Sequence, residues 1–154
     1  VVQGEVVETV HQFKRGFWPS FRAHPPSIVR FHLDAADTAD AATAIRFGFG
    51  LREEVSGPSY GDGVTFRVRG RRTDSPEPGR ILYEKYIDPK NVESDRQIHQ
   101  ARAELGNLAG GPLGLDFEND CGPRQDCRYD WALWTMPELV KNGVPPRGSP
   151  GFPE

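Results

Sequence analysis

The chain has 154 residues, a length that fits one domain built around a single hydrophobic core. Its 19 basic and 22 acidic residues are interspersed and leave a formal charge of -3, so we expect no concentrated positive field and no nucleic-acid partner. No apolar run approaches the ~20 residues that span a bilayer, so we expect no membrane insertion by this segment. The N-terminus also lacks the basic and then apolar order of a signal peptide.

Short strands are predicted in chain order from the alternation of apolar and polar residues, which is the period of a half-buried strand. Many of the 17 glycines and 14 prolines lie between these segments, where turns are needed. A polar loop at 73–79 joins two of the strands as a hairpin. The predicted strands are 27–33, 45–51, 64–69, 81–87, 113–117, 130–135 and 137–139.

The stretch from Ser94 to Leu105 is compatible with two structures. Ile98, Ala101 and Leu105 would line one face of a helix that begins at Ser94. As a strand, the same stretch would turn Ala101, Ala103 and Leu105 inward, and we favour this because alternating residues follow soon after. Seven or more short strands with turns between them indicate an all-β fold, an antiparallel β-sandwich or jelly roll.

A group of arginines is the nearest approach to a basic patch. We interpret it as the solvated face of the strand near 64–69, because the arginines are interleaved with apolar residues. The group consists of Arg67, Arg69, Arg71 and Arg72.

The domain organisation follows from these segments. We expect residues 1–26 to add an N-terminal strand and loop to the same domain, 27–140 to form the sandwich core, and 141–154 to be a Pro/Gly-rich tail or linker. The abrupt start at Val1 and this tail indicate a domain cut from a longer protein. We therefore expect it to be tethered to further domains.

The two cysteines, Cys121 and Cys127, flank a polar Gly/Pro loop. A loop of this length can close into a disulfide if the Cα atoms approach within about 7 Å. Free thiols of a cytosolic protein are the alternative, but on such a loop they would be exposed rather than buried. We therefore predict the disulfide and, with it, an extracytoplasmic location: secreted, periplasmic or on the cell surface.

Three short motifs carry a family resemblance. They are Gly-Asp-Gly-Val-Thr-Phe-Arg-Val at 61–68 after the strand at 45–51, the segment 100–111 before the alternating 113–117, and Tyr-Asp-Trp-Ala-Leu-Trp at 129–134. In this order they resemble the galactose-binding-like jelly rolls, in particular the NPCBM family of "novel putative carbohydrate-binding modules". The resemblance covers about residues 27–140 and implies a module that binds a glycan or polysaccharide. It assigns Trp134 to the family tryptophan, which we interpret as a packing residue.

Sugar sites combine a flat aromatic ring with planar polar side chains, because sugars present apolar C–H faces and a rim of hydroxyls. Trp18, followed by Arg22 and His24, lies in a Pro-rich segment that does not alternate, so its ring could be presented on a loop and is a candidate ligand contact. Packing at one end of the sandwich is the alternative for Trp18.

Two further loops offer candidate ligand contacts. Tyr60 and Asp62 lie in a Gly/Pro/Ser loop, where a ring can stack on a sugar and a carboxylate can accept hydroxyl protons. Asp62 could instead brace the turn through its own backbone. Arg124 belongs to the predicted disulfide loop, which would lose little entropy on binding, and a solvated loop tip is its alternative.

A structural calcium ion is common in related jelly rolls, and the chain supplies hard oxygen ligands for one. The candidate ligands are Asp34, Asp37 and Asp130. A solvated acidic loop is the alternative for the first two, because the loop lacks the alternate-residue acids, central glycine and closing glutamate of an EF-hand.

Catalysis is not indicated by any motif. The histidines are scattered, and neither a G-x-S-x-G elbow nor an H-E-x-x-H pair occurs. We therefore expect a noncatalytic carbohydrate-binding module of a larger extracytoplasmic or cell-envelope protein. The alternative is a structural or protein-interaction domain packed against an envelope enzyme such as a membrane glycosyltransferase, and a broad exposed apolar patch would favour it.

Overall fold

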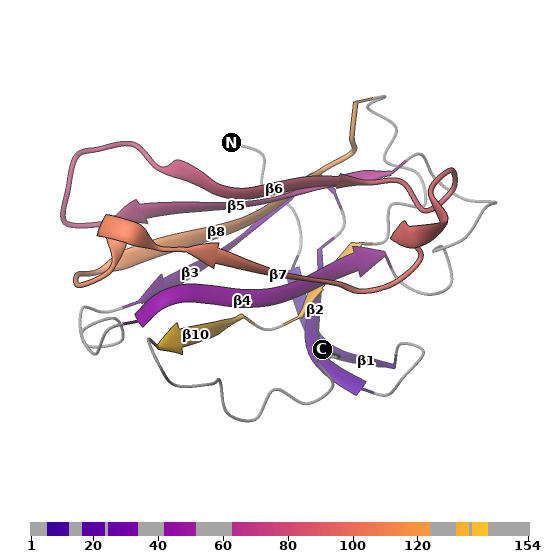
Figure 1. The fold of residues 1–154 in the computed structure, drawn as a ribbon, viewed down its shortest axis with the longest axis horizontal. Coiled ribbons are helices and arrows are strands. Elements are labelled where there is room, and N and C mark those ends of the chain that lie inside the picture. The colour runs from indigo at the N-terminus through magenta and orange to yellow at the C-terminus, as the bar shows by residue number, and fades with distance from the viewer. Residues whose placement is uncertain are drawn as a thin grey trace.

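A computed structural model gives the arrangement of the strands (Figure 1). It describes residues 6–12, 17–23, 25–33, 42–51, 63–123, 132–135 and 137–141. Side chains are described in 25–33, 44–51, 63–123, 132–135 and 137–140.

The larger sheet is antiparallel at every pairing and is centred on β4 (Ala42–Leu51). One side of β4 pairs with β7 (His99–Glu104), and the other side pairs with β9 (Ala132–Thr135) and β10 (Glu138–Lys141). Beyond β9 lie β2 (Phe17–Ala23) and then β1 (Val6–Gln12). The N-terminal strands thus belong to the same sheet as the core.

The smaller sheet has four strands in the order β3-β8-β5-β6, all antiparallel. Their bounds are β3 (Ser27–Leu33), β8 (Leu113–Asp120), β5 (Val64–Arg72) and β6 (Arg80–Ile87). Short 3₁₀ turns, η2 (Glu93–Asp95) and η3 (Gly106–Leu108), lie before and after β7. The two sheets face each other as a β-sandwich (Figure 1), which confirms the predicted all-β fold class.

One aromatic core joins the two sheets around Trp134 of β9, which is fully buried. Its ring meets Phe117 and Phe66 of the smaller sheet edge-to-face, with centroids 5.0 and 5.1 Å apart. Phe47 and Phe49 of β4 pack beside it at 5.9 and 6.0 Å. The prediction that Trp134 builds the core is therefore confirmed.

The ambiguous stretch before Leu105 forms a strand. Ala103 is 2% exposed and Leu105 is fully buried, as the strand interpretation requires, and β7 pairs with β4 along its whole length. The helix alternative does not occur, because only the three residues of η2 have helical character there.

The interpretation of the Pro-rich segment around Trp18 as a loop is wrong, because its backbone forms β2. Trp18 lies opposite His11 of β1, and Arg22 lies opposite Leu133 of β9. Pairing with a strand on each side stabilises β2, although its own sequence does not alternate.

Arginines on β5 form the solvated face that was predicted. Arg67 donates to Glu84 of β6 at 2.6 Å, and Arg69 donates to Glu118 of β8 at 2.9 Å. Arg72 departs from this prediction, because its side chain lies at the end of the sheet rather than on this face.

Two ends of the sandwich can be defined from the strand register. At the hairpin end, Arg72 of β5 pairs with Leu113 of β8, and the β5–β6 loop lies beside η3. At the opposite end, Thr65 pairs with Asp120, and Ser27 pairs with Asn119. Within the described part of the chain, no helix has the length and apolar character required to cross a bilayer.

Candidate functional site

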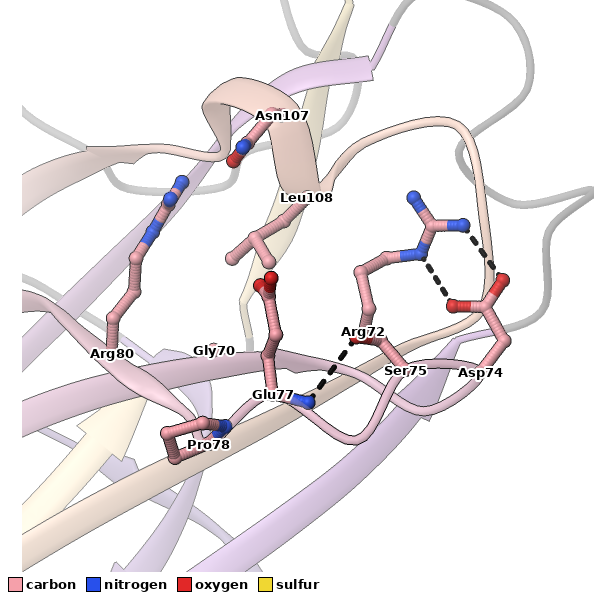
Figure 2. A pocket seen from close by; sticks show the side chains of 9 residues that line it. All are labelled: Gly70, Arg72, Asp74, Ser75, Glu77, Pro78, Arg80, Asn107 and Leu108. Atoms are coloured by element: carbon pink, nitrogen blue, oxygen red, sulfur yellow. Dashed lines mark hydrogen bonds and ion pairs between the residues drawn. The ribbon is translucent and has the colours of Figure 1, made fainter.

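A polar hollow of about 280 Å³ opens at the hairpin end, between the β5–β6 loop and η3 (Figure 2). Among the described residues, four charged side chains and one carboxamide surround it, with an apolar leucine among them. Its lining residues are Gly70, Arg72, Asp74, Ser75, Glu77, Pro78, Arg80, Asn107 and Leu108.

Antiparallel pairing explains why these residues meet. The hairpin places Gly70 of β5 opposite Arg80 of β6, so the loop at 73–79 closes the end of that strand pair. Because β8 pairs with the other side of β5, the turn η3 that precedes β8 arrives at the same end. Gly106 adopts a positive φ of 58°, which a glycine tolerates at low cost, and this lets the chain turn sharply there.

One wall of the hollow is an ion pair between Arg72 and Asp74. Arg72 Nε donates to Asp74 Oδ1 at 3.0 Å, and Nη2 donates to Oδ2 at 2.7 Å. The hydrogen bond from Arg72 lowers the pKa of Asp74 below its ordinary value, so this carboxylate is ionised at neutral pH. The two hydrogen bonds orient the planar groups of this wall relative to each other.

The other wall is formed by Arg80 and η3. Arg80 Nη2 donates to the backbone carbonyl of Leu105 at 3.0 Å, which anchors the guanidinium. Among the described residues, its Nε and Nη1 donors have no partner. Asn107 lies beside Arg80 (Figure 2), and Leu108, 8% exposed, adds an apolar surface.

Glu77 projects into the hollow between the two arginines (Figure 2). Its backbone N–H donates to Ser75 Oγ at 3.2 Å, which holds the loop in place. Within the described residues, its carboxylate forms no ion pair with either arginine. The carboxylate is therefore available to accept hydrogen bonds from a ligand.

A second hollow, of about 330 Å³, lies on the outer face of the smaller sheet. Its guanidinium and carboxylate groups form ion pairs with one another or with charged side chains on adjacent strands. Arg69 pairs with Glu118 at 2.9 Å, and Arg30 forms two hydrogen bonds with Asp116 at 2.7 and 3.0 Å. Because these charges are already paired, this hollow is a weaker candidate for a ligand-binding site than the hollow at the hairpin end.

No metal site is evident in the described residues, since no three of their His, Cys, Asp and Glu side chains lie close enough to hold an ion. Asp34, Asp37 and Asp130 lie outside the described residues, so the calcium prediction stays a prediction. One acid-histidine contact in the described residues is between His99 and Asp95, whose atoms Nε2 and Oδ1 are 3.3 Å apart.

Most of the ligand contacts predicted from the sequence lie outside the described residues, namely His24, Tyr60, Asp62 and Arg124. The backbones of Trp18 and Arg22 lie on β2, but their side chains are not described. None of these six side chains can therefore be placed relative to the others, and their roles stay predictions.

Cys121, at the end of β8, is 6% exposed and is not a free thiol. Cys127 lies outside the described residues, so the predicted pairing of these two cysteines stays a prediction.

Sequence reasoning missed the residues of the hairpin-end hollow. The segment 71–80 carries three arginines and two acids within a single polar loop and its flanks, which is a visible signal. Asn107 gives no such signal, because only the register of β8 against β5 brings η3 to this loop. The missed residues are Arg72, Asp74, Glu77, Arg80 and Asn107.

Comparison with other sequences identifies one relative. No protein-family model matches the chain. An uncharacterized protein of Archaeoglobus fulgidus is 36% identical over 95 residues, which is 62% of this chain. The match covers only 23% of that relative, so the chain spans less than a quarter of it.

Comparison of structures identifies a shared fold in Clostridium perfringens ZmpB. The structure of its CBM51-2 and INT domains matches with a TM-score of 0.56 and 10% identity, over 90% of this chain and 28% of that chain. The structure of CBM51-2 in complex with GlcNAc and INT domains gives 0.58 and 11%, over 92% and 28%. The M60 catalytic domain with CBM51-1 and CBM51-2 gives 0.53 and 10%, over 87% and 12%.

At this level of identity the likeness establishes the fold alone. The chain is an antiparallel β-sandwich that shares the fold of these domains. The fold class predicted from the alternating segments is confirmed.

Proposed function

We propose that this domain is a noncatalytic carbohydrate-binding module. The observation that carries the proposal is the match of 92% of the chain to a structure that contains a GlcNAc-bound CBM51-2 domain. The sequence motifs resemble the NPCBM family, but no family model matches the chain, so the fold match carries the proposal. Because one jelly-roll scaffold serves several kinds of ligand, direct binding to a sugar is the decisive property.

The exposed apolar surface favours this proposal over a protein-docking domain. Among the described residues, the large apolar side chains that are well exposed are Ile81 (48%), Tyr86 (37%) and Val92 (42%). Ile81 and Tyr86 lie near opposite ends of β6, so they do not join into one broad patch. A protein-interaction face would concentrate such residues.

The setting of the module is part of the proposal. We propose that it is tethered to further domains of an extracytoplasmic or cell-envelope protein and delivers them to a glycan. This chain matches only part of the Archaeoglobus fulgidus relative and of the solved chains, which supports tethering to further domains. A structural calcium ion near Asp34, Asp37 and Asp130 completes the proposal.

Glycan-array screening of the purified domain, followed by calorimetric titration with GlcNAc and other monosaccharides, tests this function. Each measurement is made with added calcium and again with a chelator. Specific binding supports the module, and binding that is lost with the chelator supports the calcium site. Failure to bind any sugar in either condition contradicts the proposal and favours a structural or protein-interaction domain.

A further inference from the structure

We propose that the hairpin-end hollow is the sugar site and that it holds a single neutral sugar unit through a pair of adjacent hydroxyl groups. This inference rests on the proposed function and adds the location, the contacting residues and the charge class of the ligand. It is carried by the hollow's charge balance, by the groups that remain unpaired in it, and by its size.

Charge balance in the hollow favours an uncharged ligand. Arg72 and Arg80 contribute two positive charges, and Asp74 and Glu77 contribute two negative charges. A sugar carboxylate would be attracted by Arg80 but repelled by the unpaired carboxylate of Glu77. A cationic amino sugar would be attracted by Glu77 but repelled by Arg80. A neutral polyol meets donors and acceptors without either repulsion.

Two opposed groups define the hydroxyl contacts. The carboxylate of Glu77 has lone pairs that can accept from two neighbouring hydroxyls, whereas Arg80 keeps its Nε and Nη1 donors for a ligand oxygen. The ion pair of Arg72 with Asp74 occupies the far side of Glu77 and acts as a positioning wall (Figure 2). Adjacent sugar hydroxyls match such planar groups, because each hydroxyl both donates and accepts.

The size of the hollow matches one sugar unit. The volume of about 280 Å³ lies just below the range of about 300–1,000 Å³ that holds drug-sized ligands. Among the described residues, no aromatic ring lines the hollow, and the apolar contacts are Leu108 and Pro78. With so small a contact surface we expect a dissociation constant on the order of 1 mM.

The test is NMR titration of the domain with neutral monosaccharides, with glucuronic acid and with glucosamine. In the wild type, the amide signals of Asn107 and Leu108 should shift with the neutral sugars and much less with the two charged ones. Glu77→Gln and Arg80→Met should each weaken binding about ten-fold or more, because each removes a charge-assisted hydrogen bond. Glu93→Gln and Arg71→Met make the same chemical changes at exposed positions outside the hollow and should bind as the wild type does.

Each result has a separate meaning. If the wild type binds no sugar, both the proposed function and the proposed sugar site are contradicted. If the wild type binds but the shifts lie elsewhere, or Glu77→Gln and Arg80→Met bind normally, the module stands and this site is wrong. Stronger binding of glucuronic acid or glucosamine than of the neutral sugars overturns the ligand class. Circular dichroism of each variant establishes that it is folded, and Glu77→Asp provides a milder second variant that should retain part of the affinity.

Discussion

The guanidinium of Arg72 occupies the space that a side chain at Gly111 would need. A Cβ added to Gly111 would lie 2.0 Å from Nη2 of Arg72 and 2.2 Å from its Cζ. Gly111 is buried at the start of the segment that leads into β8, and Arg72 reaches it from the end of β5. This close approach, together with the two hydrogen bonds to Asp74, sets the orientation of one wall of the hollow.

Gly111→Ala is expected to displace Arg72 and disturb the hollow. Because the clashing atoms are the far end of a flexible and partly exposed side chain, we expect only a small change in unfolding free energy, whereas sugar affinity should fall. Chemical denaturation and NMR titration measure the two effects. Gly114→Ala is the matched control, since the nearest atoms to its added Cβ are 3.5 and 3.9 Å away. Equal behaviour of the two alanine variants would contradict the close approach.

Arg72→Met is expected to raise the pKa of Asp74 toward its ordinary value of 3.8, because the hydrogen bond from Arg72 is the main cause of the lowered pKa. Carbon-detected NMR titration of the Asp74 carboxyl measures this directly. Arg71→Met leaves that hydrogen bond in place and should leave the Asp74 titration unchanged. A pKa of Asp74 that is the same in wild type and Arg72→Met would show that the pair does not form in solution.

The fold could be predicted where the pattern along one strand decides the structure. The predicted strand at 27–33 has the bounds of β3, and the hairpin of β5 and β6 follows from two alternating runs around a turn-rich loop. β2 could not be predicted this way, since Pro19 and the neighbouring aromatic residues break the alternation. Its strand conformation depends on pairing with β9, which is remote in sequence, and with β1, which has no strong alternation of its own.

The candidate site was beyond prediction for a different reason. The charges at 71–80 are visible in the sequence, but their grouping with η3 depends on the register of β5 against β8. A shift of that register by one residue would turn Arg72 to the other face of the sheet. The ion pair and the anchored Arg80 therefore exist only in the assembled sandwich.

Trp134→Ala is expected to destabilise the domain by roughly 3–5 kcal/mol, because it removes a fully buried ring that joins both sheets. Chemical denaturation followed by circular dichroism measures the change. Ile81→Ala is the control on an exposed position, 48% accessible, and should change stability by less than about 0.5 kcal/mol. A small effect of Trp134→Ala would contradict the assignment of this ring to the core.

His99 is expected to make the stability of the domain depend on pH. Its ring stacks on Phe49 at 5.3 Å, and burial lowers its pKa below the ordinary value of 6.5. Asp95 opposes this shift and Lys85 adds to it. Between the lowered pKa and 6.5, the unfolded chain therefore binds more protons than the folded one, so the stability from neutral His99 is lost as pH falls through this window.

Denaturation of the wild type and of His99→Gln at about pH 7.5 and about pH 5 measures this dependence. The wild type should lose more unfolding free energy on acidification than the variant, because glutamine does not titrate. Lys85→Gln removes a positive charge that disfavours the imidazolium, so the pKa of His99 followed by NMR should rise in that variant. If the wild type and His99→Gln lose equal stability, and the His99 pKa is not lowered, the histidine is not buried in the way the structure places it.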